Sequence, residues 1–496
     1  MKKSPAARCI FLLLILQPLL LVSVQSLDVC IIGSGIGGAS VAHFLRHYST
    51  IPLSIKLFER NAVVGGRMAT VTIAGDTFEA GASILHPKNY YALNFTNSLQ
   101  LSINQPSSSQ DDDLASSFGI WDGHKFLFKT IKSGSKSWIM QRIIAYANTA
   151  IVFFRYGFSL LRMDAFVEST VNKFLKYYES LESRPVFSTV EEMLQWSGLY
   201  NLTARSLEDE LTDAGLSSLL IRELVTVITR INYGQSVKMS GLAGAVSLAG
   251  SGGGLWSVAG GNKQMAAGLI NRSDVDLHLL ENIKSISNLG NYYELNSTGG
   301  NSYACDVTVV ATPLDEVAIE FSPPVVVAER KLQHTYTTFV RGILNPAFFG
   351  LSSASDIPDL VGTVEDPNIP FSSISVLKEY DDRDKTFKIF SRAPMQDALL
   401  DDLFSERTDT IHIDWAAYPQ YHPPEKFSKF VLDDKHLYYA NAFESGASTM
   451  ETSAVSGENI ARLILSRLSG ETMDRESILK NSIYDGKVQG SKHSDL

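Results

Sequence analysis

The chain has 496 residues, of which 45% are hydrophobic and 10% aromatic, with 43 Lys and Arg against 53 Asp and Glu and a net charge of −10. It is too apolar for a disordered chain, its three Cys are too few for a disulfide-stapled mini-protein, and its acidic balance argues against a nucleic-acid partner. The length predicts two or three domains with sizeable cores.

Residues 1–26 have the pattern of a secretory signal peptide: a basic start, an apolar run of 16 residues at 9–24, and a cleavage site with small residues at 24–26. The run is shorter than the roughly 20 residues of a spanning helix, so we predict cleavage rather than an uncleaved anchor. Cleavage would remove three positive charges and leave a net charge of −13, with Cys30 and Cys305 as the remaining thiols.

Four Asn-X-Ser/Thr sequons agree with a secretory route, because this pattern accepts N-linked glycans. The candidate glycosylation sites are Asn94, Asn201, Asn271 and Asn296. Cys30 and Cys305 both lie in strand-like apolar runs. Two thiols allow one disulfide at most, and we expect buried free thiols instead.

A dinucleotide-binding pattern begins directly after the leader. An apolar strand at 27–32 is followed by a glycine-rich turn and a helical pattern at 39–48. The glycines of the G-x-G-x-x-G motif are Gly33, Gly35 and Gly38. They permit a tight turn, a close approach to a pyrophosphate, and close packing of helix on strand. A second strand at 54–58 ends in Glu59, which is placed to bind a ribose diol.

The next segments resemble glutathione-reductase-type flavoproteins of the amine oxidase kind, in which a Gly-Gly-Arg turn (here 65–67) precedes a Gly-Ala turn (here 81–83). This resemblance implies non-covalent FAD held by Arg60, Gly65, Gly66, Arg67, Gly81, Ala82, Ser83, Ile283, Thr449 and Met450. A helix reaching about 468 would turn its positive N-terminus toward the flavin. The strand at 437–442 departs from the amine oxidases, because the segment 441–444 replaces their glycine turn.

Four longer blocks, at 81–90, 232–236, 255–263 and 415–424, are similar to the prenylcysteine oxidase family, called farnesylcysteine lyase in plants. The resemblance implies oxidative cleavage of the thioether of farnesylcysteine or geranylgeranylcysteine by O2 and water, to cysteine, a prenyl aldehyde and hydrogen peroxide. It also implies a lysosome or vacuole as the compartment. Two alternatives stay open: an amine or polyamine oxidase, which would share the flavin motifs, and a non-catalytic prenyl-binding escort-like protein, which would share the fold.

Candidate reacting groups accompany these blocks. His86 follows the Gly-Ala-Ser turn and either handles a proton or is a hydrogen-bonded residue behind the site. Tyr418, with Trp415, either walls a prenyl pocket or belongs to the core of the substrate sheet. We expect no metal site, and we interpret His43 and His47 as a surface pair.

The segment at 125–176 is basic within an acidic chain, since it has nine Lys and Arg, two acids and a net charge of +7. Apolar residues recur at spacings of three and four from 144 to 165, which predicts one amphipathic helix with a cationic opposite face. Two interpretations compete. The helix either makes a peripheral membrane contact or is a solvated face packed on the substrate domain.

Together these features predict an α/β fold, in which a Rossmann-like FAD-binding domain of glutathione-reductase type carries an inserted α+β substrate domain. The FAD-binding segments are 27–105, 241–325 and 428–475, the substrate segments are 106–240 and 326–427, and a tail follows at 476–496. We expect a linker at 106–113, a glycine-rich loop at 239–262, and a capping box formed by Ser188 and Glu191. The oligomeric state is left open.

Overall fold

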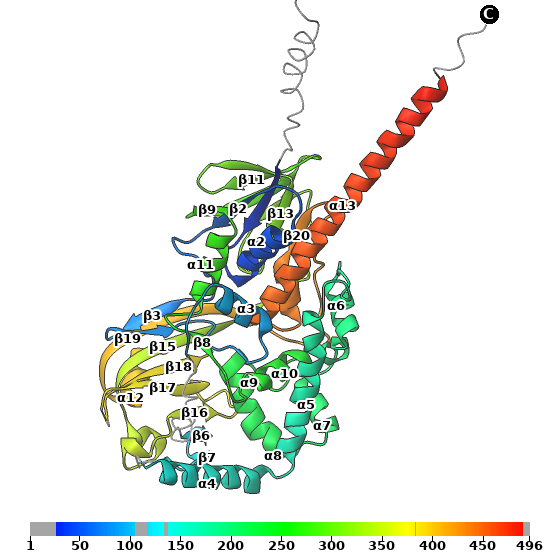
Figure 1. Ribbon diagram of the computed structural model, residues 1–496. Helices are drawn as coiled ribbons and strands as arrows, with labels where there is room; N and C mark the ends of the chain where they lie inside the picture. Colours follow the sequence, from blue (N-terminus) through cyan, green and yellow to red (C-terminus); the bar gives the residue numbers. More distant parts are fainter. Residues whose placement is uncertain (1–25, 105–116, 133–136, 382, 490–496) are drawn as a thin grey trace, which may run out of the picture.

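The computed structural model describes residues 26–104, 117–132, 137–381 and 383–489 (Figure 1). The predicted signal peptide, except for Ser26, and the predicted linker at 106–113 lie outside these residues. The described chain forms two large sheets with helices packed beside them, and this confirms the expected α/β fold.

The first large sheet is parallel, with the strand order β20-β13-β1-β2-β9. Its strands are β1 (Leu27–Ile32), β2 (Leu53–Glu59), β9 (Val275–Leu279), β13 (Val307–Val310) and β20 (Leu437–Tyr439). β13 is buried along its whole length, as a strand covered on both faces must be. Helix α2 (Ile36–Tyr48) follows β1 and contacts both α11 (Lys263–Arg272) and α13 (Met450–Gln489).

A four-stranded sheet beside the first one brings the two strand cysteines together. Its order is β12-β11-β10-β14, with β10 (Ile283–Asn288), β11 (Tyr293–Ser297), β12 (Ser302–Cys305) and β14 (Glu320–Ser322). Cys305 forms a disulfide with Cys30 in β1, and their Cα atoms are 5.8 Å apart. The expectation of free thiols is therefore wrong. The two cysteines lie 275 positions apart in sequence, so local strand patterns do not reveal that they meet.

The second large sheet has seven strands in the order β19-β15-β18-β17-β16-β6-β7, and every neighbouring pair is antiparallel except β16 with β6. Its strands are β6 (Phe118–Trp121), β7 (Phe126–Lys129), β15 (Leu332–Leu344), β16 (Leu360–Thr363), β17 (Ser373–Glu379), β18 (Lys385–Ser391) and β19 (Phe404–Pro419). Helix α12 (Asp397–Leu403) leads into β19. The hairpin of β3 (Thr70–Ile73) and β4 (Asp76–Glu79) packs on β15 and β19 of this sheet.

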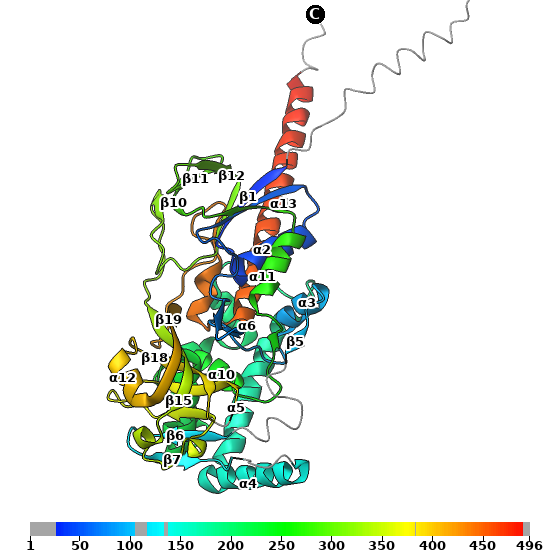
Figure 2. The ribbon, with the colours of Figure 1, turned by 90° about the vertical axis from the view of Figure 1, so that its left-hand side faces the viewer.

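Residues of 90–98 and 190–197 belong to the core of the first sheet, and residues of 138–156 and 226–233 pack on the second sheet. The remaining helices thus lie beside both sheets, with α4 at the end of the molecule opposite to the projecting end of α13 (Figures 1 and 2). They are α3 (Tyr90–Ser98), α4 (Trp138–Tyr156), α5 (Ser159–Phe174), α6 (Val190–Ser197), α7 (Leu207–Asp213), α8 (Ser218–Leu220), α9 (Thr226–Tyr233) and α10 (Gly241–Ala249). Two short strands, β5 (Ile103–Asn104) and β8 (Ser257–Val258), form a separate antiparallel pair.

Helix α10 occupies residues 241–249 of the glycine-rich loop predicted at 239–262, so that prediction is wrong there and holds for the turns at 250–254. Small side chains let this helix approach its neighbours closely, since a Cβ added at Gly244 would lie 2.6 Å from the Leu207 side chain. The capping box is also shifted by one residue: the Thr189 hydroxyl accepts from the Glu192 backbone N–H, and the Glu192 carboxylate accepts from the Thr189 backbone N–H.

The helix predicted at 144–165 is two helices. Gly157 has a φ of +59° and ends α4, and α5 leaves at an angle of 94°. The C-terminal helix is longer than predicted, because no proline after 468 interrupts α13 before Gln489. The predicted strand at 437–442 ends at Tyr439 and continues as a 3-10 turn, Ala440–Ser445.

Candidate active site

A cavity of about 620 Å³ lies between the carboxyl ends of the parallel strands and the strands β15 and β19 of the second sheet. This edge is where open α/β sheets bind their ligands. The predicted residues that line it are Gly33, Gly35, Glu59, Arg60, Gly65, Gly66, Arg67, Gly81, Ala82, Ile283, Tyr418, Thr449 and Met450. Segments from distant parts of the chain therefore converge on one site, as the resemblance to flavoproteins implies.

The glycine motif shapes one wall of this cavity. Gly33 has a φ of +108°, and a Cβ there would lie 2.6 Å from the Ala311 carbonyl oxygen. Gly38 does not line the cavity; a Cβ there would lie 2.0 Å from the Gly33 carbonyl oxygen, so glycine is needed for α2 to pack on β1. Gly35 is the N-cap of α2 and supplies no side-chain cap, so the first backbone N–H groups of the helix are available to an anion.

Glu59 is held rigidly at the end of β2. One carboxylate oxygen accepts from the Ser34 backbone N–H at 3.1 Å and from the Ser34 hydroxyl at 2.6 Å. The other accepts from the backbone N–H of Asn61 at 2.9 Å and from its side-chain amide at 2.8 Å. Glu59 is buried and lines the cavity. Its position is therefore set before any ligand arrives.

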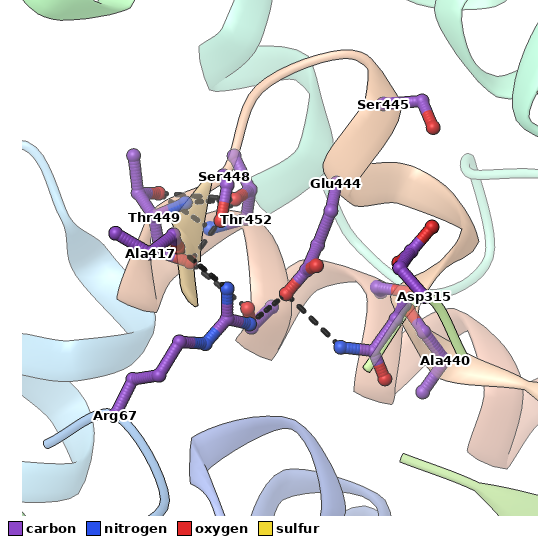
Figure 3. Close-up of polar contacts among 12 residues, drawn as sticks. Arg67, Asp315, Ala417, Ala440, Glu444, Ser445, Ser448, Thr449 and Thr452 are labelled. Carbon is purple, nitrogen blue, oxygen red and sulfur yellow. Dashed lines mark hydrogen bonds and ion pairs between the residues drawn. The ribbon is translucent and has the colours of Figure 1, made fainter. Parts of the chain in front are cut away.

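A charge network that the sequence did not reveal begins in the cavity wall with Arg67 and Glu444, whose contacts are drawn in Figure 3, and continues beyond the wall. The Arg67 guanidinium donates to the Ala417 carbonyl at 2.7 Å and forms an ion pair with Glu444. Glu444 is also 3.3 Å from Arg330, which pairs with Asp315 at 2.9 Å. Burial raises the pKa of Glu444, but the two arginines lower it further, so the pKa lies below its usual range. The signal was the unusual segment 441–444, where a carboxylate follows an aromatic residue.

A second helix N-terminus opens into the same cavity. Ser448, Thr449 and Met450 line it at the start of α13. Thr449 is fixed by exchange with Thr452: its hydroxyl accepts from the Thr452 backbone N–H at 3.0 Å, and its own N–H donates to the Thr452 hydroxyl at 2.8 Å (Figure 3). Two helix N-termini, those of α2 and α13, thus give the cavity two positively polarised points.

Ser83 lies behind the cavity wall and is held by a buried lysine on β18. The Lys388 ammonium donates to the Ser83 hydroxyl and to the Glu79 carbonyl, each at 3.0 Å. Burial lowers the pKa of Lys388 to about 8 and raises that of the Glu79 carboxyl to about 7. The Glu79 carboxylate in turn accepts from the Asn262 backbone N–H at 2.6 Å. A lysine within the largely buried strand β18 was the available sequence signal.

The two catalytic candidates lie at different cavities. Tyr418 lines the larger one and packs edge-to-face on Tyr233, with ring centroids 4.7 Å apart. Trp415 lines it too and donates from its indole to the Ala80 carbonyl at 3.0 Å. His86 instead lines a smaller cavity of about 120 Å³, where its Nδ1 accepts from the Lys88 backbone N–H at 3.0 Å. Burial, with a smaller contribution from Lys88, lowers the pKa of His86.

The smaller cavity is apolar along most of its wall and shares Thr449 and Met450 with the larger one. Val171 and Phe174 of α5, Ala245 and Ala249 of α10, and Leu255 line it. The shared residues make the start of α13 the boundary between this apolar cavity and the larger one, which we call the polar cavity because the charged side chains of Glu59, Arg67 and Glu444 line it. Sequence patterns predicted none of these α5 and α10 contacts.

Other polar groups in the larger cavity also escaped prediction. The Oγ1 atoms of Thr335 and Thr337 on β15 are buried there without a hydrogen-bond partner. At the rim, His334 Nδ1 lies 2.8 Å from Asp414, and Glu316 is 3.6 Å from the other ring nitrogen. Within the described residues, no group of three or more His, Cys, Asp or Glu is arranged to hold a metal ion.

Comparison with known proteins identifies the family. The family model described as prenylcysteine lyase matches residues 139–476, and that of an NAD(P)-binding Rossmann-like domain matches 31–99. The chain belongs to the prenylcysteine lyase family. A farnesylcysteine lyase of Arabidopsis thaliana is 62% identical over 471 residues, which cover 94% of this chain and 92% of that protein. Prenylcysteine oxidase 1 of Homo sapiens is 33% identical over 92% of each chain.

Solved structures share the architecture at low sequence identity. A putrescine oxidase variant superposes with a TM-score of 0.59 at 13% identity and covers 89% of this chain and 100% of its own. Cyclohexylamine oxidase from Brevibacterium oxydans has a TM-score of 0.58 at 16% identity, over 90% of this chain and 100% of its own. At such identities the likeness shows the fold alone. It confirms the amine-oxidase-like architecture expected from the glycine motifs.

Proposed function

We propose that this chain is an FAD-dependent oxidase that cleaves the thioether of prenylcysteines, such as farnesylcysteine and geranylgeranylcysteine. Membership of the prenylcysteine lyase family supports the substrate class. The observation that carries the proposal is the junction at Thr449 and Met450 of a polar cavity, built from the dinucleotide motif, with an apolar one. Such a junction suits a cofactor on one side and a lipid chain on the other.

The residues of the larger cavity fit FAD. Glu59 offers a fixed carboxylate for a ribose diol, and the open N-terminus of α2 offers N–H donors for a diphosphate. Gly81 and Ala82, supported from behind by Lys388, and the N-terminus of α13 would hold the flavin ring. Arg67 is paired with Glu444 in the same wall, so we assign it a role in fixing the wall as well as in facing the cofactor. Binding is non-covalent in this proposal.

Bound FAD would accept a hydride from the prenyl carbon next to sulfur. Water then adds to that carbon and the C–S bond breaks, so that thioether, O2 and water yield cysteine, a prenyl aldehyde and H2O2. The chain contributes position and shelter. Apolar side chains of α5 and α10 hold the prenyl group and exclude water from it, while Tyr418 and Trp415 cover the reacting end.

The hydrogen bonds of His86 define what it can do with a proton. Because its Nδ1 accepts from the Lys88 N–H, the neutral ring carries its proton on Nε2. Its lowered pKa keeps the ring neutral near pH 7. We therefore assign His86 a donor role at Nε2, toward a polar group of the substrate or a water, rather than the role of a general base.

Purified holoprotein tests the proposal directly. We expect flavin absorbance and, with farnesylcysteine, equal amounts of prenyl aldehyde, cysteine and peroxide. A flavin-loaded protein that makes peroxide from spermine but not from farnesylcysteine would establish the amine oxidase alternative. A colourless protein that binds farnesylcysteine without turnover would establish the escort-like alternative.

We further propose that the chain is a glycoprotein of the secretory pathway, delivered to a lysosome or vacuole. Asn94, Asn201 and Asn271 are exposed, which supports their use as glycan sites, whereas Asn296 on β11 is half-buried. We expect glycosidase treatment of protein from a eukaryotic secretory host to remove up to three glycans, and Asn296→Gln to leave that number unchanged. Protein that carries no glycan in such a host would contradict this assignment.

A further inference from the structure

Helix α4 is apolar on two opposite faces. Ile151 and Val152 point inward and pack against buried residues of the helical region. On the outward side, Ile139, Ile143 and Tyr146 follow one another at helical spacing, and each is more than half exposed. An apolar helix face is normally covered by protein or by lipid, and nothing in the described chain covers the outer apolar face of α4.

Most of the strongly exposed apolar side chains of the described residues lie on α4 and at the start of α5. Among the described residues, eleven large hydrophobic side chains are more than half exposed, and seven of them lie between 138 and 161. Phe154 is 87% exposed and Phe158 is 69% exposed, on either side of the bend between α4 and α5. Scattered apolar residues are ordinary on a protein surface, but a cluster of this kind marks an interaction site.

We propose that this surface docks on an anionic lipid bilayer. We call it the α4 face and define it by Trp138, Ile139, Ile143, Tyr146, Phe154 and Phe158, which come from the outer side of α4 and the following bend. The α4 face lies at one end of the molecule, away from the nucleotide-binding sheet (Figures 1 and 2). The inference rests on the proposed function and deepens it, because it identifies a bilayer as the source of the prenylated substrate and the α4 face as the surface that contacts it.

Charge selects the bilayer over a second copy of the chain. Between Trp138 and Met163 the sequence has three arginines and no carboxylate. Arg142 is exposed on the outer side, whereas Arg155, counted in the sequence as part of a cationic face, turns inward and pairs with Glu223 at 2.8 Å. A two-fold dimer through this face would bring Arg142 residues together without acids to pair them, whereas anionic headgroups attract them.

The shape of α4 and α5 favours docking in the plane of the bilayer. Within the described residues no single helix is long and apolar enough to cross a membrane; the pair Trp138–Tyr156 and Ser159–Tyr178 passes that test together but is bent by 94°. Helix α5 runs from the bend toward the smaller cavity, which Val171 and Phe174 near its far end help to line. The docked end and the apolar cavity are thus connected by a single helix of 16 residues, about 24 Å long.

Lipid-quenched tryptophan fluorescence tests the docking without substrate. The full chain, flavin-loaded and made in a secretory host, would be mixed with vesicles of phosphatidylcholine and phosphatidylserine that carry bromine on their acyl chains. Trp138 is 60% exposed, whereas Trp121 and Trp256 are buried and Trp196 and Trp415 are half-buried. We expect brominated vesicles to quench the emission, and Trp138→Phe to abolish that quenching. Equal quenching in Trp138→Phe would overturn the assignment of the face.

Vesicle flotation of variants supplies the second measurement. Phe154→Ser with Phe158→Ser should lower the partition coefficient at least about tenfold per phenylalanine, since burying each ring contributes roughly 1.5–3 kcal/mol. Arg142→Glu should weaken binding to anionic vesicles and reduce its dependence on salt. The matched controls, Val326→Ser on an exposed loop and Lys284→Glu on β10, should bind as the parent chain does.

Either of two results would overturn the proposal. In one, the double variant and its control float equally, with unchanged flavin absorbance and thermal unfolding. In the other, the parent chain is a dimer that the double variant dissociates, while vesicles bind neither, so that the face is an interface between copies. If the parent chain itself fails to bind the vesicles while it still turns over detergent-dispersed farnesylcysteine, this inference is rejected and the proposed reaction stands.

Discussion

The two cavities that meet at the start of α13 are built in opposite ways. The larger one is walled by glycine turns, two helix N-termini and the ion pair of Arg67 with Glu444, and Arg330 contacts Glu444 from outside the lining. The smaller one is walled mostly by apolar side chains of α5 and α10. Buried charges require their partners in one geometry, whereas apolar burial is non-directional. From this comparison we expect the polar cavity to require a group of fixed shape and the apolar cavity to accept chains of different length.

We expect the largest loss of stability from a substitution at Gly38, where the fold beside the polar cavity has no room for a side chain. In Gly38→Val the new Cβ would lie 2.0 Å from the Gly33 carbonyl oxygen, so the two atoms would clash. We expect a loss of about 4 kcal/mol or more of stability, and protein without flavin, measured by thermal unfolding and absorbance. Gly253→Val is the control, because nothing lies within 4 Å of its Cβ position. A Gly38→Val protein with normal flavin content would show that the polar cavity does not require this fixed geometry.

A smaller loss is expected from the charge network. Glu444→Gln keeps the shape of the side chain but removes the charge that faces Arg67 and Arg330. Removing one partner of a fully buried ion pair costs about 3–5 kcal/mol, and the loss here should be smaller, because Arg67 is partly exposed and Arg330 keeps Asp315. Urea unfolding would measure the loss, and flavin release should accompany it. The control is Glu406→Gln, an exposed carboxylate on β19, which should change stability by less than about 0.5 kcal/mol. Equal midpoints for the two variants would mean that the network does not hold the wall.

The carboxyl of Glu451, which lies at the boundary between the two cavities, should make the stability of the fold depend on pH. Glu451 is buried in the first turn of α13 and accepts from Tyr178 at 2.7 Å and from two backbone N–H groups of α3. Burial raises its pKa from 4.5 to about 7, although these donors lower it. The fold therefore favours the protonated carboxyl. The stability that this group contributes is complete below about pH 4.5 and is lost as the pH rises to about 7.

Glu451→Gln measures that contribution. Chemical denaturation between pH 4.5 and 8 should show a fall on the order of 3 kcal/mol for this group in the parent chain, and a correspondingly shallower fall in the variant. Glu79 and Glu425, whose pKa values burial also raises to about 7, keep a residual slope in both proteins and serve as the internal reference. Identical slopes would show that Glu451 is ionised in the folded chain at all these pH values.

What the sequence could predict differs between the two cavities in the same way. The polar wall could be predicted from local motifs, because Gly33, Gly38 and Glu59 are each needed for a backbone conformation or a ligand contact formed by residues close to them in the chain. The apolar wall forms where α5 packs on α10. Apolar residues at helical spacing predict a buried helix face, but they do not predict which other helix that face contacts. The pairing of Cys30 with Cys305 and of Arg67 with Glu444 failed to emerge for the same reason: each joins segments that only the tertiary fold brings together.

The smallest change in stability, and the most selective effect on activity, is expected in the apolar cavity. Ala249 lines it from the end of α10, so Ala249→Phe should fill part of its volume of about 120 Å³ without touching the nucleotide motif. Two methylenes displaced from apolar contact cost roughly 1.6 kcal/mol, or a little more than tenfold in kcat/KM. We therefore expect kcat/KM for farnesylcysteine to fall about tenfold, with flavin content unchanged. The five-carbon analogue, S-(3-methylbut-2-enyl)cysteine, needs less of the cavity and should be turned over as before, and Ala204→Phe at an exposed position should affect neither substrate. Equal losses for both substrates would place the prenyl chain outside the smaller cavity and would remove the distinction between a wall that fixes shape and a wall that accepts length.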